Sequence, residues 1–169
     1  MSPQEALERL LRSYTRYYDL IEVPPAPFQA AAEFHSHGES YLLIKSAKLW
    51  EMDSNEFVFF SAEDAMTADS VSQRIETAWD LTMPQIQPSE NHRNSDVTVI
   101  FLTDLLPEDA RRLVRHTNRS KGYKHGMQGW SNLRLGAIEL STGRIACNRH
   151  GRDLKKLLSN IMKSNAIGE

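Results

Sequence analysis

The residues best suited to chemistry lie in one stretch, residues 119–130, which interleaves cations with aromatic rings in a glycine-rich loop (RSKGYKHGMQGW). Backbone phosphates pair with lysine and arginine, and exposed bases stack on aromatic faces. The stretch therefore predicts a surface that binds nucleic acid or another polyanion. Together with flanking arginines, the residues assigned to this surface are Arg115, Arg119, Lys121, Tyr123, Lys124, Trp130 and Arg134.

The charge distribution favours the same surface but has a second interpretation. Residues 1–106 contain 7 Lys and Arg against 17 Asp and Glu, a net charge of −10, whereas residues 107–169 contain 13 against 5, a net charge of +8. This asymmetry indicates an anionic partner for the basic half. It is equally compatible with attraction between the two halves, within one fold or between two copies in a homo-oligomer. Tyr123 and Trp130 would then be core residues.

A second basic cluster, formed by Arg149, His150 and Arg152, lies where the last helix is expected to begin. Backbone amides at a helix N-terminus attract anions, and neighbouring Arg and His side chains add positive charge. The cluster therefore predicts a small anion site, and a solvated basic turn is the alternative.

Metal and cofactor chemistry have little support in the sequence. His35 and His37 are close to Glu33 and Glu39, but these residues straddle an expected hairpin turn, where His and Glu are ordinary solvated residues. The single cysteine, Cys147, excludes an internal disulfide and a four-cysteine zinc site. The chain also lacks the phosphate-binding glycine loops, the H-E-x-x-H motif and the G-x-S-x-G elbow. We therefore assign no metal ligand and no cofactor.

Hydrophobic periodicity predicts the elements that carry these residues. Ser2, Pro3 and Glu5 form the capping signature of a first helix, which ends before the prolines at 24–27. Residues 40–50 are apolar on both faces, which predicts the central strand of an antiparallel meander. The order α-βββ-α-β-α-ββ-α follows, with strands at 30–35, 40–50, 56–60, 97–102, 133–140 and 144–147 and later helices at 62–81 (capped by Ser61), 107–119 and 151–162.

Length and composition place these elements in one domain. The 169 residues are 40% hydrophobic and 25% charged, which is close to the globular average and sufficient for one core. No apolar run approaches the roughly 18 residues that span a bilayer, and the N-terminus is too polar for a signal peptide. We expect a single cytoplasmic α+β domain over residues 1–169, with a mixed sheet of about five or six strands packed with helices.

The predicted order of helix, three-stranded meander, helix and strand resembles the core of restriction-endonuclease-like nucleases. The resemblance implies a divalent metal held by an acidic residue that opens the second strand, here Glu39, and by a D/E-x-K motif on the third strand. The third strand reads Glu56-Phe57-Val58, so the lysine is missing, and Lys45 of the second strand takes its place in this interpretation. A nuclease that uses Glu39, Lys45 and Glu56 around Mg²⁺ is thus the alternative function.

At the level of sequence, three segments are similar to an uncharacterised bacterial family common in clostridia and other anaerobes. The similarity lies in the regions around EFHSHGESYLLIKSAKLW, NEFVFF and GWSNLRLGAIELSTGRIACNRHGRDLKKLL, which together cover about half of the chain. The resemblance implies a bacterial cytoplasmic protein. The basic C-terminal half predicts that this protein is a non-catalytic binding module for nucleic acid or another polyanion.

Overall fold

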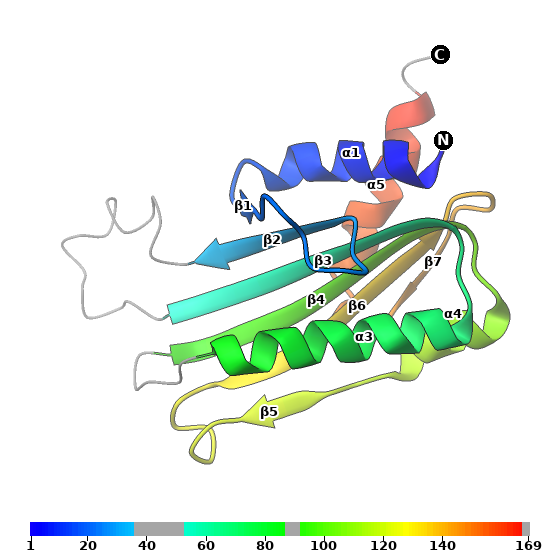
Figure 1. The fold of residues 1–169 in the computed structure, drawn as a ribbon. Coiled ribbons are helices and arrows are strands. Elements are labelled where there is room, and N and C mark those ends of the chain that lie inside the picture. Colours follow the sequence, from blue (N-terminus) through cyan, green and yellow to red (C-terminus); the bar gives the residue numbers. More distant parts are fainter. Residues whose placement is uncertain (36–52, 87–91, 167–169) are drawn as a thin grey trace.

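A mixed β-sheet with helices on both faces forms the centre of the chain (Figure 1). The structure, a computed structural model, describes residues 1–35, 53–86 and 92–166. The helices in this part are α1 (Pro3–Tyr14), α3 (Ala68–Thr82), α4 (Glu108–His116) and α5 (Leu154–Ala166), with a short 3₁₀ turn, η2 (Met83–Gln85). The strands are β1 (Asp19–Leu20), β2 (Ala30–His35), β3 (Asp53–Ala65), β4 (His92–Leu105), β5 (Ser120–Gly122), β6 (Trp130–Glu139) and β7 (Arg144–Cys147).

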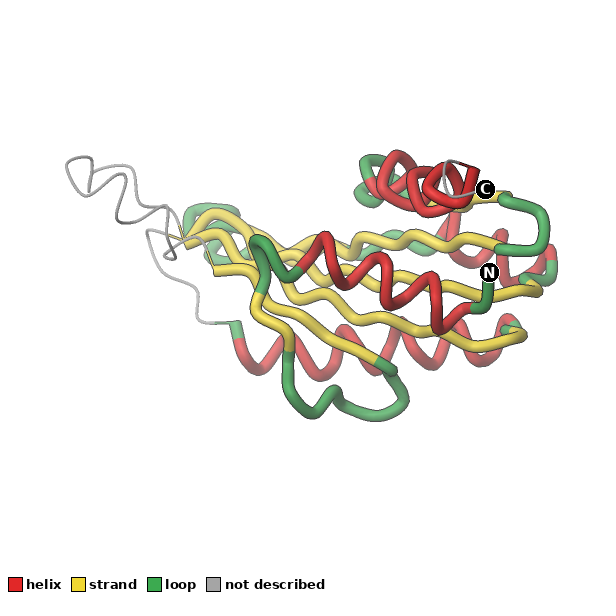
Figure 2. The backbone as a smooth tube through the Cα atoms, turned by 90° about the horizontal axis from the view of Figure 1, so that it is seen from above, coloured by secondary structure: helices red, strands yellow, loops and turns green. Residues whose placement is uncertain are grey.

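The strands of the sheet follow the order β1-β2-β3-β4-β6-β5, and β7 also pairs with β6. β3, β4 and β6 run parallel, whereas β1, β2, β5 and β7 add antiparallel pairings. Parallel neighbours need crossover connections of consistent hand, and α3 and α4 provide them on one face of the sheet. The other helices, α1 and α5, cover the opposite face (Figures 1 and 2).

Alternation along the central strand β4 builds an apolar core on each face. Val97, Val99 and Phe101 belong to the core beneath α3 and α4, and Ile100 and Leu102 to the core beneath α1 and α5. All five side chains are fully buried. Because helices cover both faces, this strand is apolar on both sides, as the sequence predicts for residues 97–102.

The first helix begins as predicted but ends earlier. Ser2 and Glu5 form a reciprocal capping box, with hydrogen bonds of 3.0 and 3.1 Å between each side chain and the other residue's backbone amide. α1 ends at Tyr14 because the chain leaves the helix and pairs with β2 through β1. Tyr17, which falls within the predicted helix but beyond α1, is 67% exposed.

The second predicted helix begins six residues later than its pattern indicated. Thr67, not Ser61, caps α3, because its hydroxyl accepts the Ser70 N–H at 3.1 Å and the Ser70 hydroxyl accepts the Thr67 N–H at 3.0 Å. Residues 61–65 instead continue β3 and extend its parallel ladder with β4. Backbone pairing in the ladder thus overrides the weak helical pattern of those residues.

The α+β class and the mixed sheet are confirmed, and the order of elements broadly matches the prediction. The described sheet has seven strands rather than five or six, because β1 and β5 are too short for a hydrophobic period to be recognised. The predicted strand at 40–50 lies outside the described residues, and β2 pairs directly with β3, from Ala30 opposite Phe60 to His35 opposite Asn55. No described helix is long and apolar enough to cross a membrane.

Candidate functional site

The predicted basic loop lies at the edge of the sheet, where β5 pairs with the start of β6 (Figure 1). Lys121 is opposite Ser131, and Gly122 is opposite Trp130. Lys124 follows in the connecting turn and has a positive φ of 45°. Both lysines are exposed, and Trp130 is 43% exposed. This part of the predicted surface is therefore accessible from solvent.

Tyr123 supports this loop from the interior. Its side chain is 8% exposed, and its hydroxyl lies 2.8 Å from the Ser131 hydroxyl. Its backbone carbonyl accepts the N–H groups of Gly126 and Gln128 at 3.0 and 3.1 Å. A buried ring has no free face for a base, so we leave Tyr123 out of the interface.

Two of the predicted phosphate contacts are paired with carboxylates of this chain. Arg115 lies 3.2 Å from Glu108. Arg119 bonds Glu76 of α3 through both terminal nitrogens, and its guanidinium lies 5.3 Å from the centre of the Trp79 ring. The hydrogen bond from Arg119 holds the pKa of Glu76 below its ordinary value. The Arg119–Glu76 pair joins the basic half to the acidic half within one chain, which agrees with the second interpretation of the charge asymmetry.

Arg134 is the centre of a partly buried polar network on the α5 face of the sheet. One terminal nitrogen is bonded to Glu56 of β3, and the other to Asp153 before α5. Glu56 also accepts hydrogen bonds from the hydroxyls of Tyr18 and, at 2.6 Å, Thr98. Burial lowers the pKa of Arg134, but the charges of Glu56 and Asp153 and the hydrogen bond to Asp153 outweigh burial and raise it overall. Arg134 is therefore a charged structural residue within the fold.

The second predicted cluster, of Arg149, His150 and Arg152, lies in the turn before α5. The buried Asn148 joins this turn to β6 by hydrogen bonds. The Asn148 carbonyl oxygen Oδ1 accepts the Leu135 N–H at 2.9 Å, and its amide Nδ2 donates to the carbonyls of Leu133 at 2.8 Å and Thr117 at 3.0 Å. The turn is thereby held beside the segment that leads into β5. Its predicted site residues are all exposed: Arg149, His150 and Arg152.

α5 begins three residues later than predicted, which changes the expected anion site. The amide of Leu154 donates to the Gly151 carbonyl at 3.0 Å, and the amide of Lys155 donates to the Arg152 carbonyl at 3.2 Å. Two amides at the helix N-terminus are therefore already occupied. What remains of the predicted site is the exposed positive charge of the turn, notably Arg149 and Arg152.

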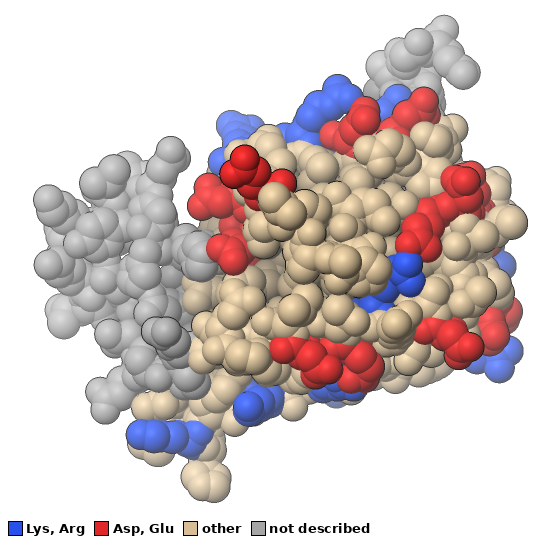
Figure 3. All heavy atoms as spheres, in the orientation of Figure 1, with Lys and Arg blue, Asp and Glu red and all other residues tan. Residues whose placement is uncertain are grey.

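Four exposed cations lie along this edge of the sheet, and we call them the basic edge: Lys121, Lys124, Arg149 and Arg152. None of the four makes an ion pair with a residue that the structure describes. Figure 3 shows Lys and Arg side chains at the lower left, over β5 and the loop after it, beside acidic side chains over α3. The basic edge thus combines unneutralised cations of two separate predictions: Lys121 and Lys124 of the predicted surface, and Arg149 and Arg152 of the predicted anion site.

β6 holds the two halves of the basic edge at a fixed spacing. Lys121 is opposite Ser131, and Asn148, which precedes Arg149, is bonded to Leu135. Ser131 and Leu135 are four residues apart on one strand, a distance of about 13 Å at roughly 3.3 Å per residue. One extended polyanion can therefore contact both halves.

The described residues form no metal site of the kind that the nuclease alternative requires. Glu39, Lys45 and His37 lie outside them. Glu56 is described, but its two carboxylate oxygens accept hydrogen bonds from the network around Arg134, so a cation would have to displace the guanidinium. Within the described ranges, no group of three or more His, Cys, Asp or Glu residues is placed to hold a metal ion.

A hollow of about 260 Å³ opens over the Arg134 network, where Tyr14 and Tyr18 of the α1 region face Leu154 and Leu157 of α5. Burial, and secondarily the charge of Glu56, raises the pKa of both phenols. Both phenols therefore stay protonated at neutral pH and do not serve as general bases, and the Tyr18 hydroxyl donates a hydrogen bond to Glu56. We therefore attribute this hollow to packing around the ion pair of Arg134 and Glu56.

Asp96 of β4 lies opposite Glu56 and gives the network a pH dependence. Its Oδ1 is buried and has no hydrogen bond to a described residue. Burial and the charge of Glu56 raise the pKa of Asp96; Arg134 and hydrogen bonds from Asn94 and the Asn132 backbone oppose the shift without cancelling it. Above the unfolded pKa of about 3.9, the native carboxyl still holds its proton while the unfolded one loses it, so stability falls as pH rises through the folded pKa.

We expect Asp96→Asn to raise the free energy of unfolding at pH 7, because the amide carries no charge in the buried network. The gain should shrink as pH falls below about 3.9, where Asp96 is protonated in both states. Urea unfolding of both proteins, followed by circular dichroism across pH, measures the difference. A variant that is less stable than the wild type at pH 7 would contradict the assigned burial cost.

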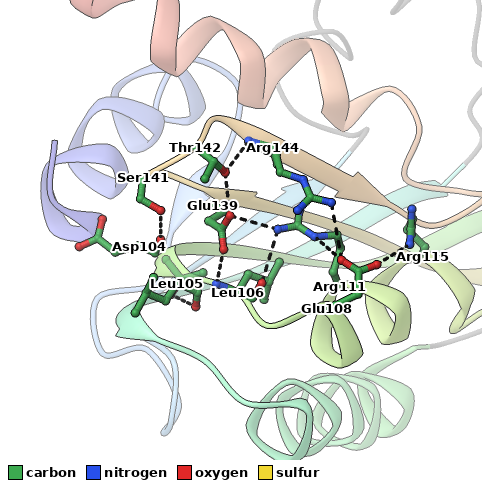
Figure 4. Close-up of polar contacts among 11 residues, drawn as sticks. Asp104, Leu105, Leu106, Glu108, Arg111, Arg115, Glu139, Ser141, Thr142 and Arg144 are labelled. Carbon is green, nitrogen blue, oxygen red and sulfur yellow. Dashed lines mark hydrogen bonds and ion pairs between the residues drawn. The ribbon is translucent and has the colours of Figure 1, made fainter.

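A second buried ion pair clamps α4 to the turn between β6 and β7 (Figure 4). Glu139 accepts the Leu106 N–H at 2.7 Å and the Thr142 hydroxyl at 2.7 Å, and its Oε1 lies 3.2 Å from Arg111. The Arg111 side chain is only 3% exposed, and Glu108 lies on its outer side. Arg111 donates through Nη2 to Glu139 and to the Leu106 carbonyl, whereas its Nε and Nη1 make no hydrogen bond with the described residues. The Arg111–Glu139 pair joins α4 to the turn, and the two residues lie too far apart in the sequence for a local pattern to reveal the pair.

The chain matches the model of one protein family over residues 2–160, and that family is described as "Domain of unknown function (DUF8052)". The match spans most of the chain, so the chain belongs to this family. This match confirms the prediction that the chain belongs to an uncharacterised family. No curated protein and no solved structure matches the chain.

Proposed function

We propose that this member of the DUF8052 family is a non-catalytic binding module that holds nucleic acid along its basic edge. The observation that supports this function is the partition of the cations. Arg115, Arg119 and Arg134 are paired with carboxylates, whereas the basic edge makes no ion pair in the described part of the chain. Cations without carboxylate partners on a surface attract phosphates and gain free energy from the counterions that they release.

The cellular setting in this proposal is the bacterial cytoplasm. The sequence resemblance to a family of clostridia and other anaerobes supports it, as does a chain with a single cysteine, since disulfide frameworks belong to oxidising compartments.

Charge reversal at the β5 end of the basic edge tests the proposal. We expect Lys121→Glu/Lys124→Glu to weaken binding of labelled DNA and RNA oligonucleotides by about tenfold or more at low salt, because two attractive phosphate contacts become repulsive. Fluorescence anisotropy titrations measure the affinity. Both lysines are exposed, so the folded state should tolerate the change.

A control with the same change in net charge separates this effect from bulk electrostatics. Arg12→Glu/Arg112→Glu alters exposed residues of α1 and α4 and should change affinity by less than about threefold. Equal losses in the two variants, or none in either, would contradict the assignment of the basic edge. Light scattering on the same samples shows whether the acidic half of a second copy is the partner instead.

A further inference from the structure

We infer that the ligand of the basic edge is single-stranded nucleic acid, one base of which stacks on Trp130. The inference rests on the proposed function and narrows it to one class of ligand. Three features of the β5–β6 edge carry it: an accessible indole, the position of that indole relative to the cations, and the polar side chains beside it.

Trp130 is an aromatic side chain with room for a partner. It is 43% exposed at the first residue of β6, and its indole makes no hydrogen bond to any residue in the described ranges. Its cross-strand neighbour on one side is Gly122, which has no side chain. Even a Cβ placed at Gly122 would meet only the Gly126 nitrogen, at 3.9 Å. Open space on this side leaves room for a base against the ring.

Lys121 and the Trp130 ring lie on opposite faces of the same edge. Residues directly opposite each other in a sheet share a face, and successive residues alternate. Lys121 therefore lies on the face of Ser131, whereas Trp130 lies on the face of Gly122. A ligand that contacts both must turn around the edge of the sheet. A single strand can do so, whereas a duplex, with a persistence length of about 50 nm, cannot bend over such a distance.

Polar side chains beside Trp130 suit the edge of a base. Asn94, whose Nδ2 donates to Asp96 at 3.2 Å, is the neighbour of Trp130 on β4, and Asn132 is two residues along β6 on the same face. Asn132 accepts a hydrogen bond from the Ser120 hydroxyl at 2.8 Å, which orients its amide. Amide side chains both donate and accept hydrogen bonds, as the edges of unpaired bases require.

Parallel titrations of single-stranded oligothymidine and of a duplex of equal length test the inference. We expect the wild type to prefer the single strand and Trp130→Ala to weaken single-strand binding by roughly 5- to 100-fold with little effect on duplex binding. Trp130→Phe should retain most of the affinity, which guards against a general defect of Trp130→Ala. Tyr17→Ala, which removes another exposed aromatic ring, is the matched control and should change neither affinity.

Tryptophan fluorescence gives a second readout. Stacking should quench emission of the wild type when oligothymidine binds, and Trp130→Phe should abolish this quenching while binding persists. Equal affinity for single strand and duplex, or an unchanged single-strand affinity in Trp130→Ala, would overturn the inference and leave the proposed function in place. Failure of both nucleic acids to bind at low salt would overturn both.

Discussion

Glu139→Ala should lower the free energy of unfolding by about 3–5 kcal/mol, because it leaves the buried guanidinium of Arg111 without its buried carboxylate partner. The variant also removes the acceptor of the Leu106 N–H, which is bonded to Glu139 at 2.7 Å. Domains of this size have only about 5–15 kcal/mol of stability, so the variant should be close to unfolding at moderate temperature. Urea unfolding followed by circular dichroism measures the change.

Glu108→Ala is the matched control, since Glu108 contacts the same arginine at 3.4 Å but is 48% exposed. Its loss should cost about 1 kcal/mol or less, because solvent screens exposed ion pairs. Replacing both buried partners, in Glu139→Ala/Arg111→Leu, should recover part of the lost stability. Similar losses in Glu139→Ala and Glu108→Ala would show that the buried pair does not clamp α4 to the hairpin.

Arg149→Ala/Arg152→Ala should reduce the salt dependence of nucleic-acid binding by about half. For single strands, the slope of log affinity against log salt is about −0.7 per neutralised phosphate, so four cations predict about −2.8 and the variant about −1.4. Between 50 and 200 mM salt, the wild type should lose about 50-fold in affinity and the variant about sevenfold. Anisotropy titrations over a salt series give both slopes.

The β5 end supplies the internal comparison for this prediction. Lys121→Ala/Lys124→Ala should reduce the slope by the same amount as the arginine pair, because each variant removes two phosphate contacts. Arg12→Ala/Arg112→Ala should leave it unchanged. If the slope of the arginine variant equals that of the wild type, the turn before α5 lies outside the interface, and the ligand contacts only the β5 end.

Local signals in the sequence predicted much of the fold. The capping box at Ser2 and Glu5 and the apolar strand around Val97–Leu102 have short-range causes, and both are confirmed. The predicted start of α3 was wrong because Ser61 and Thr67 are both residue types that cap helices. Only the ladder between β3 and β4, a long-range feature, decides between them.

The candidate site was less predictable, because ion pairing decides which cations remain available. Arg134 and Glu56 are 78 residues apart in the sequence, and Arg119 and Glu76 are 43 apart. No local pattern reveals that these arginines are neutralised while Lys121 is not. Nor does the sequence indicate that Asn148 fastens the turn of Arg149 to β6, which brings two separate basic clusters to one edge.

The most direct test of the basic edge is the affinity of the wild-type chain for a labelled single-stranded oligonucleotide, measured by anisotropy from low salt to about 200 mM. Four phosphate contacts predict saturable binding at low salt and a log–log slope near −3. A log–log slope near zero, or no saturable binding at the lowest salt, would contradict the account and show that the basic edge does not bind nucleic acid.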